Sequence, residues 1–172
     1  MIELGVTATR TTAHGTASWR ISRPGMDDYF LGHAVVTGPS NCQLAYQSEL
    51  CGLYGIVLSV WSLVQTYEFQ VDLTIGCDGL SALNQFQFVD DFTNPNIPQF
   101  DLISATRWLL KEINGKYNWK HIKGHQDDDA RAVLDEWAYW NIQMDRDAKQ
   151  IWDNRRTSVK WIVYSGCLEK RE

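Results

Sequence analysis

Three carboxylates stand at positions where a folded chain would ordinarily place an apolar or neutral side chain. Glu49 directly precedes an apolar stripe, Asp78 follows a predicted buried strand, and Asp145 falls on the apolar stripe of a long predicted helix. Open α/β sheets bind ligands beyond the carboxyl ends of their strands, and Asp78 stands at such an end. A carboxylate on an inward-facing stripe, such as Asp145, must be paired, hydrogen-bonded or bound to a metal ion.

Ordinary structural roles compete with this interpretation. Glu49 could complement the dipole at the start of its helix, and Asp78 could cap the helix that follows it. Asp145 is harder to explain in this way, because its helix neighbours at four and three residues are Asn141 and Ala148. The functional interpretation therefore depends on whether the three carboxylates converge.

A convergent set of carboxylates would favour a bound cation. Clustered carboxylates repel one another, so their pKa values rise unless a cation joins them. Oxygen ligands without a set of cysteines or histidines suit a hard ion such as Mg²⁺ or Mn²⁺. The sequence therefore predicts a divalent-metal site made of Glu49, Asp78 and Asp145.

His125 follows a predicted strand and opens a polar loop. An exposed loop histidine without a function is one interpretation of this position. The other is a histidine that shuttles protons or helps a product leave beside the metal site. The acidic run at 127–129 is left out of the predicted site, because acidic loop runs are usually solvated.

The elements that would position these residues can be predicted from periodicity and turn signals. Strands are predicted at 2–9, 16–21, 29–36, 69–76, 117–122 and 159–164. Helices are predicted at 50–64, 79–84, 100–113 and 134–152. The first three strands would form an antiparallel meander, and the later alternation of strands and helices predicts a mixed α/β sheet with helices on its faces.

Composition limits the class of protein. The length of 172 residues suits one domain, and hydrophobic and charged shares of 44% and 22% exclude disordered and disulfide-dense chains. The four cysteines form no C-x-x-C pair, which favours buried thiols over a zinc site. The net charge of -5 argues weakly against nucleic-acid binding. Without a signal peptide or a membrane-spanning apolar run, we expect an intracellular protein, cytoplasmic or nuclear.

Five short motifs in order resemble those of the ribonuclease H family, specifically the RNase H domains of retroelement reverse transcriptases. The motifs lie at 15–19 (GTASW), 46–50 (YQSEL), 76–79 (GCDG), 121–125 (HIKGH) and 141–148 (NIQMDRDA). Each motif alone is weak, but five in order, each on its expected element, are a strong signal. The resemblance covers roughly residues 2–154.

The resemblance implies an RNase H-like fold over residues 1–156, with a C-terminal extension at 157–172 that contains the last strand. Its mixed five-stranded sheet would have three antiparallel strands followed by two parallel ones. The implied reaction is hydrolysis of the RNA strand of RNA–DNA hybrids with two Mg²⁺ or Mn²⁺ ions. Glu49, Asp78 and Asp145 would be the matching metal ligands, and His125 would be the matching catalytic histidine. We expect a monomer that does not bind membranes, with the hybrid and a reverse transcriptase domain of the same polyprotein as partners.

One departure from the family pattern puts activity in doubt. The family's first catalytic aspartate aligns with Ala8, with Thr7 or Thr9 as the alternative positions, and no carboxylate follows until Asp27. Its loss removes a ligand that would bridge both metal ions, by engineered substitution or by natural divergence. The alternative function is therefore an inactive RNase H-like domain that binds hybrid or a protein partner. A DNA strand-transfer or junction nuclease on the same fold is less favoured, because His125 precedes the last helix.

Groups that would contact the hybrid are harder to identify. RNA is distinguished from DNA through its 2′-hydroxyls, which short polar groups and backbone amides can read. By position, the candidate substrate-binding residues are Thr16, Ser48, Asn84 and Gln85. Residues 87–99 contain no basic segment like the handle of bacterial enzymes, so we expect weak hybrid binding with a shallow salt dependence.

Overall fold

The computed structural model describes residues 15–25, 28–36, 44–68, 70–87, 95–128, 131 and 133–157, the last four by their backbone alone. The elements in chain order are β1 (Gly15–Ser22), β2 (Tyr29–Val36), α1 (Ala45–Tyr67), β3 (Val71–Cys77), α2 (Leu80–Leu83), α3 (Phe100–Glu112), β4 (Gly115–His121), the short 3₁₀ helix η2 (Gln126–Asp128) and α4 (Glu136–Thr157). The described part of the chain is therefore the mixed α/β structure that the sequence predicts.

The strands of the described residues form two small sheets. β1 and β2 pair antiparallel, with Ser18 opposite His33, and β3 and β4 pair parallel, with Ile75 opposite Trp119. The prediction of one five-stranded sheet is not met in the described residues, which contain two sheets of two strands each. The predicted strands at 2–9 and 159–164 lie outside the described residues, and so does Ala8.

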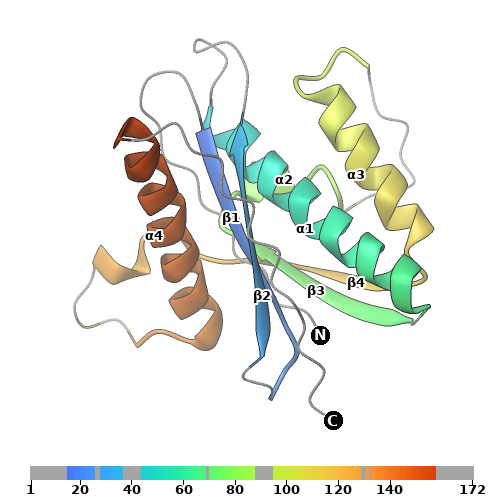
Figure 1. Cartoon of the computed structure of the whole chain (residues 1–172), viewed down its shortest axis with the longest axis horizontal. Coiled ribbons are helices and arrows are strands. Elements are labelled where there is room, and N and C mark those ends of the chain that lie inside the picture. Colours follow the sequence, from blue (N-terminus) through green and yellow to red (C-terminus); the bar gives the residue numbers. More distant parts are fainter. Residues whose placement is uncertain are drawn as a thin grey trace.

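Helices cover both faces of β1. All eight residues of β1 are buried, and Figure 1 shows α4 on one side of the β1–β2 pair and α1 on the other. The ring of Trp19 packs against Gly55 of α1. On the opposite face, the Thr16 hydroxyl donates a hydrogen bond of 2.9 Å to the backbone oxygen of Ala148 in α4. The guanidinium carbon of Arg20 lies 3.2 Å from the centre of the Trp140 ring in α4. These two contacts hold α4 against the sheet.

The core lies between α1, α3 and the strands. Its largest fully buried side chains include Phe86, Leu53, Ile75 and Ile103. By length and composition alone, α1 could cross a membrane. The sequence analysis had expected no apolar run long enough to do so. Its buried residues recur at steps of three and four and belong to the core cluster, as expected for a helix that covers a sheet.

Candidate active site

Asp78 lies at the carboxyl end of the parallel pair. Leu73, Ile75 and Cys77 of β3 are buried, and the backbone nitrogen of Ile122 donates to the Cys77 oxygen at 3.0 Å, just beyond the paired residues. A ring nitrogen of His121 lies 3.1 Å from the backbone oxygen of Asp78. The helix that follows begins after Gly79 as N-cap and has no side-chain cap. Capping of α2 therefore does not explain Asp78.

Glu49 approaches Asp78 from α1. The helix begins at Ala45 and has no acidic residue in its first turn, so the helix-dipole interpretation of Glu49 fails. Its carboxylate lies against the turn after Asp78, where a methyl group added to Gly79 would come within 2.0 Å of Oε2 of Glu49. Burial, and then the charge of Asp78, raise the pKa of Glu49 to about 7. The absence of a side chain at position 79 therefore lets two acidic residues, distant in sequence, meet.

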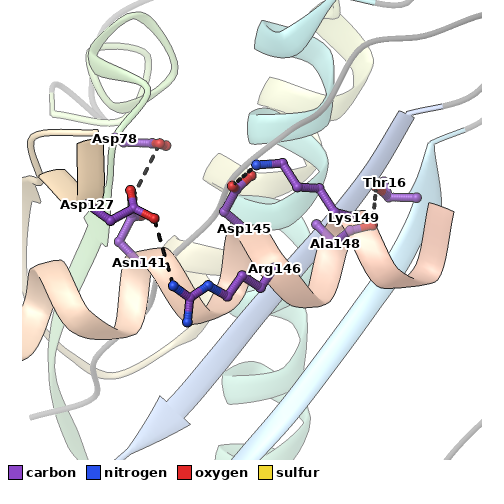
Figure 2. Close-up of polar contacts among 8 residues, drawn as sticks. All are labelled: Thr16, Asp78, Asp127, Asn141, Asp145, Arg146, Ala148 and Lys149. Carbon is purple, nitrogen blue, oxygen red and sulfur yellow. Dashed lines mark hydrogen bonds and ion pairs between the residues drawn. The ribbon is translucent and has the colours of Figure 1, made fainter. Parts of the chain in front are cut away.

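The carboxylate of Asp78 is only partly satisfied. Nδ2 of Asn141 in α4 donates to Oδ2 of Asp78 at 3.4 Å, a contact seen in Figure 2. Oδ1 is buried and has no hydrogen-bond partner among the described residues. Burial raises the pKa of Asp78, and hydrogen bonds from Asn141 and from the backbone of Asp78 itself lower it. The charge of Asp145 raises this pKa further, and that of His125 lowers it. A buried carboxylate oxygen without a partner is a natural position for a cation.

The charge of Asp145 acts on Asp78, but the carboxylate of Asp145 is paired with a lysine. Its Oδ2 accepts a hydrogen bond from Nζ of Lys149, one turn further along α4, and the two side chains form an ion pair (Figure 2). In the described ranges, no group of three His, Cys, Asp or Glu side chains is arranged to hold a metal ion. The three predicted carboxylates thus share one neighbourhood, with Glu49 and Asp78 adjacent and Asp145 paired to a lysine.

His125 lies on the loop between β4 and α4. Its backbone has a left-handed φ of 53°, and its side chain is near enough to lower the pKa of Asp78. Gly124 lets this loop approach, because a methyl group there would lie 3.3 Å from Oδ2 of Asp78. Asp127, from the acidic run excluded from the predicted site, lies 3.9 Å from Arg146 of α4. Residue 129 of that run lies outside the described residues.

The predicted substrate-binding residues divide by exposure. Thr16 is fully buried and bonded to α4, and Ser48 is buried on α1, so burial argues against contact of either side chain with a ligand. Asn84 is exposed after α2, and Gln85 is half-buried, with its backbone oxygen accepting from Arg107 at 2.9 and 2.6 Å. The predictions for Asn84 and Gln85 remain predictions.

Sequence reasoning missed Asn141, Lys149 and His121 as members of this neighbourhood. A signal was present for the first two, because both lie four residues from Asp145 and such residues share a helix face. His121 gave no comparable signal, since its contact to Asp78 depends on the pairing of β3 with β4.

The comparisons with known proteins concern the fold. No protein-family model and no curated protein matches the sequence. RNase H1 from the archaeon Halobacterium salinarum NRC-1 is similar in structure, with a TM-score of 0.55 at 13% identity over 89% of this chain and 98% of that one. The PFV RNase H domain has a TM-score of 0.55 at 11% identity, over 87% and 91% of the two chains. The N-terminal RNase H domain of a Mycobacterium tuberculosis protein has a TM-score of 0.50 at 10% identity, over 91% and 100%. Because the sequence identities are this low, the structural similarity is evidence about the fold alone. The fold of this chain is that of a ribonuclease H-like domain.

Proposed function

We propose that the chain is a divalent-metal ribonuclease H domain that cleaves the RNA strand of RNA–DNA hybrids, with activity lowered by the loss of the first aspartate. The observation that carries this proposal is the meeting of Glu49 and Asp78, two half-buried carboxylates with raised pKa values, at the carboxyl end of β3. Two acidic groups have no structural reason to share such a place without a cation.

The residues present fit a hard divalent ion. Glu49 and Asp78 would hold it, and Oδ1 of Asp78 is buried without a partner among the described residues. Asp145 would join them if it left Lys149. When bound, Mg²⁺ or Mn²⁺ supplies Lewis-acid stabilisation and lowers the pKa of bound water.

The remaining residues act on the carboxylates and on protons. Asn141 orients Asp78 through its Nδ2 bond and favours the ionised carboxylate. His125 is on a loop that the small Gly124 allows to approach Asp78, and it is placed to take or deliver a proton beside the site. Asn84 and Gln85 follow α2 and are the candidate contacts to the hybrid groove.

A second candidate is an inactive domain that binds hybrid or a protein partner. Two observations favour it: Ala8 stands where the family pattern has an aspartate, and Asp145 is paired with Lys149. As part of the proposed function we also place the domain inside the cell, beside a reverse transcriptase domain of the same polyprotein. The resemblance of the sequence motifs supports this placement.

Cleavage of a hybrid with a labelled RNA strand separates the two candidates. The full chain, Ala8→Asp, Asp78→Asn and the double variant would be compared in Mg²⁺ and in Mn²⁺, with folding checked by circular dichroism. We expect Ala8→Asp to raise cleavage by at least about tenfold, which is 1.36 kcal/mol of barrier, and Asp78→Asn to abolish the gain. A folded Ala8→Asp variant that binds hybrid but leaves the RNA intact in both ions would establish the binding-only candidate.

A further inference from the structure

Lys149 holds the third carboxylate of the candidate site. It lies four residues after Asp145 on α4, and its ammonium group binds Oδ2 of that residue (Figure 2). The side chain of Asp145 is 18% exposed and that of Lys149 is 49% exposed, so the pair lies at the edge of the site with the carboxylate inward. An acidic residue four positions before a basic one on a helix is a favourable arrangement.

The ion pair makes Asp145 different from Glu49 and Asp78. Oδ1 of Asp78 has no partner among the described residues, and the Glu49 carboxylate lies against the turn at Gly79. Asp145, in contrast, already has a cation bound to Oδ2. Asp145 nevertheless lies close enough for its charge to act on Asp78. A divalent ion shared between Asp78 and Asp145 would therefore have to compete with the lysine ammonium.

Lysine and a divalent ion are not equivalent partners for a carboxylate. The ammonium group is a compact single charge with three hydrogen-bond donors, and it cannot accept further oxygen ligands. Mg²⁺ and Mn²⁺ require several oxygens around one centre. While Lys149 is bound, Oδ2 of Asp145 is occupied and a positive charge lies beside the carboxylate, so a divalent ion binds there less favourably.

We propose that Lys149 is a built-in cation that competes with divalent metal for Asp145. The first ion then binds at Glu49 and Asp78 without Asp145, and a second ion binds only after displacing the lysine. This inference rests on the proposed function, because it takes Glu49 and Asp78 as metal ligands. Lys149 is then a positioning residue: by holding Asp145, it sets how many ions the site binds at a given metal concentration.

Calorimetric titration of the full chain with Mn²⁺ tests the inference without any measurement of activity. Lys149→Met removes the ammonium and keeps an unbranched side chain of good helix propensity. The matched control is Arg146→Met, which removes one positive charge from the same helix and also breaks a pair, the one with Asp127. Asp145→Asn and the Lys149→Met, Asp145→Asn double variant complete the set.

We expect Lys149→Met to tighten Mn²⁺ binding about tenfold, which is about 1.4 kcal/mol, or to add a second binding event. About 0.5 kcal/mol of this is the helix ion pair that no longer competes, and about 1 kcal/mol is the lost repulsion between the ammonium group and the metal ion. The control should stay within about twofold of the parent, because only the general loss of positive charge affects it. Asp145→Asn should remove any second binding event, and the double variant should lose the gain of Lys149→Met.

Two results would overturn the inference and leave the proposed function standing. In the first, Lys149→Met binds Mn²⁺ with the affinity of the parent. In the second, its gain in Mn²⁺ affinity is no larger than that of Arg146→Met. In both cases Asp78→Asn must still abolish binding. If Mn²⁺ binds neither the parent nor Lys149→Met, the inference and the metal site of the proposed function fail together.

Discussion

Replacement of Glu49 by glutamine should change how the stability of the domain depends on pH. Burial and the neighbouring Asp78 raise the pKa of Glu49 from 4.5 to about 7 in the folded chain. Between these two values the folded state binds more protons than the unfolded state, so the free energy of unfolding falls as the pH rises. The loss is complete above pH 7, where Glu49 is ionised in both states.

The size of this effect follows from the same two pKa values. A rise from 4.5 to about 7 corresponds to an upper limit of about 3.4 kcal/mol, at about 1.36 kcal/mol for each pH unit. Glu49 is only half-buried, so solvent screening reduces this to about 1–2 kcal/mol. Glu49→Gln keeps the shape of the side chain and removes the charge. It should therefore be more stable than the parent by about 1–2 kcal/mol at pH 8 and nearly equal to it at pH 4.5.

Urea unfolding in EDTA at pH 4.5, 6 and 8 measures this dependence. The matched control is Glu112→Gln, which neutralises an exposed glutamate at the end of α3 and should change stability little at any of these pH values. Divalent ions should reverse the effect, because added Mn²⁺ at pH 8 stabilises the parent more than the Glu49→Gln variant. A variant that is destabilised equally at all three pH values would refute the electrostatic reasoning, since it would point to lost packing alone.

Three further substitutions test the geometry around the site. Gly79→Ala places a methyl group 2.0 Å from Oε2 of Glu49, so the carboxylate must move and Mn²⁺ affinity, followed by calorimetry, should fall between about 10-fold and 100-fold. Asn141→Ala removes the bond that lowers the pKa of Asp78, so the pH midpoint of Mn²⁺ binding should move to higher pH; an unchanged midpoint would contradict this role. Thr16→Val removes the buried hydrogen bond to α4 and should cost about 1 kcal/mol in urea unfolding. Its hybrid affinity should equal that of the parent, and a selective loss of affinity would restore Thr16 as a substrate contact.

Periodicity predicted the parts of the fold that depend on local sequence. The alternation from 16 to 21 indicated a strand and the steps of three and four from 50 to 64 indicated a helix, and β1 and α1 contain both segments. The position of Asp78 followed from the end of a buried strand, which the structure confirms as the end of β3. Helix starts were less predictable, because α1 begins at Ala45, five residues before its apolar stripe, and this moved Glu49 out of the first turn.

Contacts between distant elements were beyond local patterns. Thr16 lies on the polar face of its strand, a face that periodicity would assign to solvent, yet α4 covers it from 132 residues further along the chain. Ser48 is buried on α1 for a similar reason, since its exposure depends on what packs against the helix. The pair of Asp145 with Lys149 is local and could have been predicted from spacing. The effect of this pair on metal binding could not have been predicted, because the prediction would require knowing that Asp145 lies near Asp78.

The acidic composition of the chain is consistent with the way the site is arranged. At neutral pH without metal, Glu49 is partly protonated because its pKa is about 7, and Asp145 is paired with Lys149. A proton and an ammonium group thus already offset two of the three carboxylates, and Asn141 donates to the third. Ala8 adds no further negative charge where the family pattern would have one. The site is therefore less dependent on divalent ions for folding than a cluster of four ionised carboxylates would be. The sequence resemblance implies that position 8 belongs to the site, so Ala8→Asp should increase both the metal affinity of the site and its need for metal. The stability of Ala8→Asp should therefore fall in EDTA and recover in Mn²⁺.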